Sequence, residues 1–273
     1  MGGEYMSVGR ILFVNQSIEP YLEATYESKI GKQLPITIQG KGIETRVFMP
    51  KYGLVNEKKH LLHEVIRLSG QNIVISRHTH PLIIKVSSIP AFRMQTYFIV
   101  NDHYFGRKNF LTDETGKYFT DNDERAIFYA RGVMETVKNL SWRPDIIHCH
   151  GWISCLVPIF LKKFYIDNPF FSNAKIIYSV YDDHSTKNVS RSFVNKLHKS
   201  GIPIEDAERY EKIDYETALK LAIEYSDGVV ISNRNVSKGI REHIAQLEKP
   251  FFEHKENKYA DKYMELYQLI MEK

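Results

Sequence analysis

The sequence contains little cysteine and no long apolar run. Only Cys149 and Cys155 occur among its 273 residues, and two thiols are too few for a disulfide framework. We therefore expect a reduced, cytoplasmic setting. The longest apolar runs, such as residues 11–14, are too short to cross a bilayer, and nothing near the start resembles a secretory signal. The sequence thus predicts no membrane partner.

Charge of one sign is also scarce. The 37 Lys and Arg residues barely exceed the 33 Asp and Glu residues, which gives a net charge of +4. No block of five or six basic residues occurs, so the sequence predicts neither a nucleic-acid partner nor a polybasic membrane anchor. Hydrophobic residues make up 43% and charged residues 26% of the chain, which is the composition of an ordinary globular domain.

Glycine is missing where a nucleotide-binding turn would need it. The stretch after the first predicted strand, residues 15–21, contains no glycine, and the next glycine is Gly31. Backbone N–H groups approach a phosphate closely where glycines leave room. A glycine-rich phosphate cradle is therefore disfavoured. The residues favour a non-nucleotide ligand, or none, at this turn, and we expect no bound cofactor.

Short β-rich runs alternate with helical patterns along the chain, which is typical of βαβ units. Strands are predicted at residues 10–14, 43–49, 73–76, 82–86, 95–99, 145–149, 174–180 and 228–232. Helices are predicted at residues 28–41, 121–140, 152–164, 205–225, 236–247 and 259–270, with a long loop at 182–203. The strands within 73–99 suggest a hairpin-like addition. The fold class is α/β: a single Rossmann-like, doubly wound, mostly parallel sheet.

Three helices carry more specific expectations. Pro35 predicts either a first turn or a kink in the first helix. Asp121 or Asp123 is expected to cap the helix at 121–140. In the last helix one face collects Tyr259, Tyr263, Leu266, Tyr267 and Ile270.

The carboxyl ends of the strands are the expected ligand crevice of such a sheet, here after Val14, Cys149 and Val180. Alternation along the strand at 145–149 places His148 and His150 on one face, with Cys149 opposite. One interpretation is a metal site, but two histidines lack a further close ligand, so we expect no metal. A second places His150 and Trp152 at the crevice lip, with Gly151 allowing the turn. A third is purely structural.

Tyr181, Asp182 and Asp183 follow the strand at 174–180. Paired acids at a strand end could bind sugar hydroxyls, act as a general base or hold a cation. They could equally cap the following loop or helix. Aromatic residues are 12% of the chain. Most are expected in the core, and stacking on sugar rings is the alternative.

Several collinear segments resemble the N-terminal catalytic domain of bacterial glycogen synthases and plant starch synthases. Gly42-Ile-Glu-Thr-Arg-Val-Phe-Met-Pro-Lys-Tyr52 is similar to the family's Gly-His-Glu-Val-Arg-Val-Val-Met-Pro-Arg-Tyr. Pro144-Asp-Ile-Ile-His-Cys-His-Gly-Trp152 is similar to Pro-Asp-Val-Ile-His-Ala-His-Asp-Trp. The resemblance implies a retaining ADP-glucose glucosyltransferase of the GT-B architecture, acting on α-glucan.

The functional positions of that family match poorly. Its Lys-Thr-Gly-Gly-Leu loop, which meets the nucleotide sugar, falls on the segment Glu23, Ala24, Thr25, Tyr26 and Glu27. A cation is thereby replaced by Glu23 and the glycines by Thr25 and Tyr26, which disfavours ADP phosphates. The family's aspartate falls on Gly151. Its donor-contacting histidine falls on Tyr181, followed by Asp182.

The resemblance also implies a domain plan. Residues 6–250 would form the Rossmann-like domain, and residues 251–273 a helix that returns to pack on it, with the second GT-B domain absent. We expect the isolated chain to be inactive in glucosyl transfer. Two hypotheses remain: an acceptor-side half that a partner chain or self-association completes, and a catalytically silent protein that binds a glucan, a metabolite or another protein.

Overall fold

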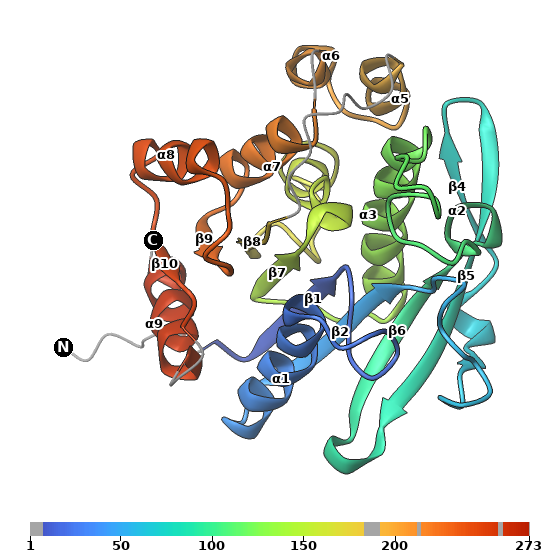
Figure 1. The fold of residues 1–273 in the computed structure, drawn as a ribbon, viewed down its shortest axis with the longest axis horizontal. Helices are drawn as coiled ribbons and strands as arrows, with labels where there is room; N and C mark the ends of the chain where they lie inside the picture. Colours follow the sequence, from blue (N-terminus) through green and yellow to red (C-terminus); the bar gives the residue numbers. More distant parts are fainter. Residues whose placement is uncertain (1–7, 183–191, 212–213, 256–258, 273) are drawn as a thin grey trace.

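The computed structural model describes residues 8–182, 192–211, 214–255 and 259–272 (Figure 1). Its centre is a ten-stranded mixed sheet in the order β10-β9-β8-β7-β1-β2-β6-β5-β3, with β4 paired to β5. The strands are β1 (Arg10–Asn15), β2 (Glu44–Pro50), β3 (His63–Glu64), β4 (Gln71–Ile75), β5 (His78–Ile89), β6 (Met94–Val100), β7 (Ile146–His150), β8 (Lys175–Val180), β9 (Gly228–Ile231) and β10 (Phe251–Glu253). The predicted α/β class is confirmed.

Seven of these described strands, from β10 to β6 in the sheet order, pair in parallel. Strands β1, β7, β8 and β9 are almost wholly buried, because helices cover both faces of a parallel sheet. Strands β3, β4 and β5 add antiparallel pairs beside β6, which confirms the predicted hairpin-like addition. The parallel arrangement brings the carboxyl ends of β1, β7, β8, β9 and β10 to one edge.

Helices cover both faces of the sheet (Figure 1). The α-helices are α1 (Tyr26–Gly40), α2 (Asp102–Phe105), α3 (Asn122–Asn139), α4 (Val157–Ile159), α5 (Phe193–Lys199), α6 (Ile204–Ala207), α7 (Tyr215–Glu224), α8 (Lys238–Gln246) and α9 (Tyr259–Met271). Short turns of other helix types are η1 (Ile66–Leu68), η2 (Pro90–Phe92), η3 (Trp152–Ser154), η4 (Phe160–Phe164) and η5 (Glu208–Tyr210).

Helix α9 packs beside α1. Of the predicted face, Tyr263, Leu266, Tyr267 and Ile270 are buried, whereas Tyr259 is half-buried. Lys41 after α1 pairs with Asp261 at 3.0 Å. The Tyr267 hydroxyl lies 2.8 Å from His148 Nδ1 on β7. The last helix is therefore docked on the domain, and this part of the predicted fold is confirmed.

The start of α1 is closed by its own side chains. Thr25 Oγ1 accepts a hydrogen bond from Ser28 N at 3.1 Å, and Ser28 Oγ accepts one from Thr25 N at 2.8 Å. This capping box stabilises the first turn and starts the helix two residues before the prediction. Pro35 lies inside the helix and not in its first turn, and it is buried.

Several boundaries differ from the prediction. The segment predicted as a helix at 152–164 is divided into η3, α4 and the π-turn η4, and that at 205–225 is interrupted before Asp214, which caps α7. The loop predicted at 182–203 contains α5, while residues 183–191 lie outside the described part. Strand β10 has no counterpart in the prediction, because its three residues are too few to show a period.

Neither candidate aspartate caps α3 with its side chain. Helix α3 has no side-chain cap, because the Asp121 carboxylate accepts two hydrogen bonds from Arg107 at 2.6 Å. The Asp123 carboxylate pairs with Lys196 of α5 at 2.8 Å. Its other oxygen, Oδ1, accepts a hydrogen bond from Glu124 N at 2.8 Å, so only Asp121 is drawn wholly away from the helix start by its ion pair.

Candidate functional site

Two adjoining cavities open along the carboxyl edge of the sheet. The smaller cavity, about 360 Å³, is lined by Gln16, Thr25, Tyr26, Glu27, Phe110, Tyr181, Asp182 and Asn233. The larger cavity, about 880 Å³, is lined by Tyr26, Asn233, Arg234, Asn235, Glu253, His254 and Lys255. Tyr26 and Asn233 belong to both linings, so the cavities are neighbours. Cavities at this edge are expected in parallel α/β sheets.

The smaller cavity brings together residues from both predicted segments. Thr25, Tyr26 and Glu27 come from the start of α1, and Tyr181 and Asp182 follow β8. Glu23 and Ala24 are exposed and absent from this lining. Asp183, the second predicted acid, lies outside the described residues. The structure therefore brings together two of the four acidic candidates, Glu27 and Asp182, at this edge of the sheet.

Glu27 is fixed within the cavity wall. Its Oε2 accepts a hydrogen bond from Gln16 Nε2 at 3.1 Å, while Gln16 Oε1 accepts one from Ile153 N at 3.1 Å. Gln16 N in turn donates to the His150 carbonyl at 3.0 Å. The wall thus joins the residues after β1, the start of α1 and the turn after β7.

The two histidines of β7 lie on one face, as alternation predicted. Their ring centroids are 4.1 Å apart, and both residues are buried. His148 Nδ1 lies 2.8 Å from the Tyr267 hydroxyl and Nε2 lies 2.8 Å from Ser179 Oγ. His150 Nδ1 lies 3.0 Å from the Tyr181 hydroxyl. Both nitrogens of His148 are therefore already engaged, which leaves it no position for a metal ion.

Burial holds both histidines neutral. It lowers the pKa of His150 to about 3, with a smaller effect from His254, and it lowers the pKa of His148 well below its usual range. Burial raises the pKa of the Tyr181 phenol well above its usual range. The His150–Tyr181 pair is consequently an uncharged hydrogen bond beneath the smaller cavity.

Lowering the pH from 7.5 to 5 is expected to destabilise the protein, with about 2 kcal/mol coming from His150 alone. An unfolded histidine titrates near 6.5, whereas folded His150 stays neutral down to about 3. Between these values the unfolded state binds a proton that the folded state excludes, so stability falls as the pH falls. Urea unfolding at both pH values measures the difference.

The pH slope also has a matched control. His150→Gln should reduce the dependence of unfolding free energy on pH, whatever its effect on absolute stability. His63→Gln removes an exposed histidine of β3 and should leave the slope unchanged. Equal slopes in the wild type and His150→Gln would contradict the assignment.

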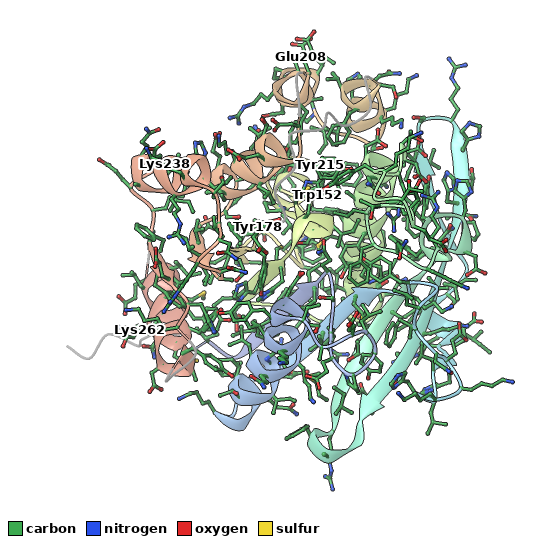
Figure 2. All side chains as sticks on the ribbon, in the orientation of Figure 1. Trp152, Tyr178, Glu208, Tyr215, Lys238 and Lys262 are labelled. Carbon is green, nitrogen blue, oxygen red and sulfur yellow. The ribbon has the colours of Figure 1, made fainter. Side chains whose placement is uncertain are left out.

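The prediction that His150 and Trp152 lie at an open crevice lip is wrong. His150 is 1% exposed and Trp152 is fully buried. The Trp152 indole donates a hydrogen bond to the Tyr215 carbonyl at 3.2 Å, with ring centroids 4.4 Å apart. Figure 2 shows the Trp152 and Tyr215 side chains inside the domain, whereas Lys238 and Lys262 lie at its periphery. The turn into η3 directs Trp152 toward α7 and away from the cavities.

Gly151 does make the predicted tight turn. Its φ is +77°, and a Cβ atom there would lie 2.2 Å from Glu27 Oε1 and 2.7 Å from Gln16 Cβ. Glycine is required because the left-handed backbone and the close neighbours both exclude a side chain.

Several lining residues were missed by sequence reasoning. Phe110, Asn233, Arg234 and the segment after β10 carried no recognised signal. Asn233 and Arg234 follow a predicted strand, so the carboxyl-end rule could have included them. Phe110 lies in a connection far from any strand end, and only the tertiary fold places it at the cavity.

Within the described residues, no cluster of three or more His, Cys, Asp and Glu side chains is arranged to hold a metal ion. Among the described helices, none combines the length and the apolar character that a membrane crossing requires. Cys149 and Cys155 are both free and buried. The cytoplasmic setting stays a prediction.

The sequence model described as "Starch synthase catalytic domain" matches residues 10–253. The chain belongs to this family. Curated relatives include a glycogen synthase of Chlorobium limicola, 37% identical over 174 residues, which covers 63% of this chain and 36% of the relative. A glycogen synthase of Chlorobaculum parvum is 32% identical over 238 residues, which covers 85% of this chain and 47% of the relative. The chain thus spans half or less of these relatives.

A solved structure shares the fold of this starch synthase family domain. It is described as the catalytic domain of starch synthase IV from Arabidopsis thaliana bound to ADP and acarbose. The TM-score is 0.72 with 17% identity, over 90% of this chain and 51% of the other. The predicted glycosyltransferase family and mostly parallel α/β architecture are both confirmed.

Proposed function

We propose that this starch synthase family chain binds α-glucan at the smaller cavity and does not by itself transfer glucose from ADP-glucose. The observation that carries the proposal is the lining of that cavity, where Glu27 and Asp182 lie with Tyr26, Tyr181 and Phe110. Carboxylates accept hydrogen bonds from sugar hydroxyls, and aromatic faces pack against the apolar side of a sugar ring.

The relatives support a glucan as the ligand class. The relatives from Chlorobium limicola and Chlorobaculum parvum are glycogen synthases, and the solved starch synthase IV domain is bound to ADP and acarbose. This chain spans about half or less of their length, so their activity is a proposal for this chain.

The start of α1 supports the second half of the proposal. Phosphates are held by free N–H groups at a helix start and by cations. Here Thr25 and Ser28 cap the helix with their own side chains, and residues 23–27 contain two glutamates and no cation. A donor diphosphate at this loop would meet negative charge.

Completion of a catalytic site by a second chain or by self-association stays a prediction.

Two measurements test the proposal. Incorporation of glucose from labelled ADP-glucose into glycogen by the purified chain is expected to stay at background. Calorimetric titration with maltoheptaose is expected to show saturable binding, about tenfold weaker in Asp182→Ala through loss of one hydrogen bond to a charged group. Glucose incorporation that His150→Ala abolishes would contradict the inactive half of the proposal.

The matched control is Asp167→Ala. Asp167 is an exposed carboxylate in the connection before β8, at the opposite edge of the sheet. Its removal changes the net charge as Asp182→Ala does but should leave maltoheptaose affinity unchanged. Equal losses in the two variants, or no binding by the wild type, would contradict glucan binding at the smaller cavity.

A further inference from the structure

We propose that the larger cavity binds the phosphate group of a phosphorylated sugar, with the sugar directed toward the smaller cavity. The sugar part of this inference rests on the proposed function, whereas the phosphate part stands on the charges and geometry of the larger cavity alone. The two parts can therefore fail separately.

Two cations, Arg234 and Lys255, line the larger cavity. Arg234 follows β9 and Lys255 follows β10. Both are exposed, and neither forms an ion pair with any residue that the structure describes. The acid in the lining, Glu253, is already paired with Arg241. The lining therefore carries an excess of positive charge, which attracts an anion.

The loop that carries Arg234 is held in place without a ligand. Arg241 Nη2 donates to the carbonyls of Asn233 and Arg234 at 3.2 and 3.1 Å, and its Nε donates to the Val236 carbonyl at 3.1 Å. Asn233 Oδ1 also accepts a hydrogen bond from Asn235 N at 2.8 Å. Because the backbone is fixed by these bonds, a ligand would find the loop already shaped and would not have to order it.

The lining of the larger cavity also contains two aromatic rings, those of Tyr26 and His254. The rings of Tyr26 and His254 meet edge to face with centroids 5.9 Å apart, and His254 Nδ1 lies 3.1 Å from the Tyr263 hydroxyl of α9. Tyr26 borders both cavities, so a sugar ring against it would extend from one to the other. The docked α9 thereby helps to hold His254 in the lining.

The charges of the two cavities orient the ligand. Glu27 and Asp182 line the smaller cavity and would repel a phosphate, while the cations of the larger cavity attract it. An uncharged sugar with one phosphate group fits this polarity, with its phosphate between Arg234 and Lys255. The larger cavity, at about 880 Å³, lies within the size range of small-molecule sites.

Titration calorimetry of the full chain with three probes tests the inference: glucose 1-phosphate, inorganic phosphate and maltoheptaose. We expect glucose 1-phosphate to bind, and Arg234→Gln and Lys255→Gln each to weaken it about tenfold through loss of a charge-assisted contact. Inorganic phosphate should bind more weakly, because it lacks the contact with Tyr26. Maltoheptaose affinity should be unchanged in both variants.

Lys238→Gln is the matched control, because Lys238 is an exposed lysine of α8 whose side chain is 89% accessible. It should leave all three affinities unchanged. Absence of glucose 1-phosphate binding, or equal losses in Lys238→Gln and Lys255→Gln, would overturn the phosphate site. Equal affinities for the two phosphate probes would overturn the sugar part. Phosphate binding without maltoheptaose binding would refute the proposed function and leave the phosphate site standing.

Discussion

Replacing Arg125 with methionine is expected to lower the free energy of unfolding by about 3–5 kcal/mol. Arg125 is fully buried, and its guanidinium donates to the Tyr104 carbonyl at 2.8 Å, to Asn122 Oδ1 at 2.6 Å and to the Phe110 carbonyl. Methionine keeps the stem of the side chain but leaves these buried acceptors without their donor. Urea denaturation followed by tryptophan fluorescence measures the loss.

The same substitution should weaken glucan binding, because the Phe110 backbone is held by Arg125 and its side chain lines the smaller cavity. The control is Arg143→Met, which removes an exposed guanidinium that lies over the Phe170 ring and should cost about 1 kcal/mol or less. Arg125→Met with a stability within 1 kcal/mol of the wild type would show that the buried guanidinium is dispensable.

Replacing Gly151 with alanine should lower the free energy of unfolding by about 2–4 kcal/mol. Left-handed backbone costs an L-residue about 1–2 kcal/mol, and the new Cβ would lie 2.7 Å from Gln16 Cβ. Moving Gln16 also disturbs its hydrogen bonds to Glu27 and Ile153, so maltoheptaose affinity should fall as well. Calorimetric unfolding and titration measure the two effects.

Gly116→Ala separates backbone strain from the steric clash. Gly116 has a φ of +79°, close to that of Gly151, but a Cβ there would meet no atom within 4 Å. The Gly116→Ala variant should therefore lose only the backbone contribution to the free energy of unfolding, about 1–2 kcal/mol. Equal losses at the two glycines would show that the approach of Gln16 and Glu27 to Gly151 carries no cost.

The family motif has an aspartate where this chain has Gly151, and an aspartate at position 151 would meet the same obstacle. Its side chain would enter the space that Glu27 Oε1 occupies, 2.2 Å from the position of a Cβ atom. Glycine at 151 and glutamate at 27 therefore fit one another. These two departures from the family pattern, far apart in the sequence, are one structural feature.

Sequence reasoning succeeded where a residue's position follows from its own strand or helix. The shared face of His148 and His150 came from strand alternation, and the buried face of α9 came from helical spacing. It failed for Trp152, whose direction depends on how the chain turns after Gly151 and on Tyr215 beyond it. It failed also for Asp121, because Arg107 binds the carboxylate that would otherwise cap α3.

The sequence by itself determined the α/β class, the parallel centre of the sheet, the edge that carries the cavities and the family resemblance. These follow from hydrophobic periodicity and collinear motifs, which are local properties of the chain. Only the tertiary structure decided which side chains meet at that edge. Crossovers of the sheet bring Glu27 against Gly151, place Phe110 and Tyr181 in the lining of one cavity, and place Arg234 and Lys255 in the lining of the other. Contacts between separate elements depend on packing and leave no periodic signal.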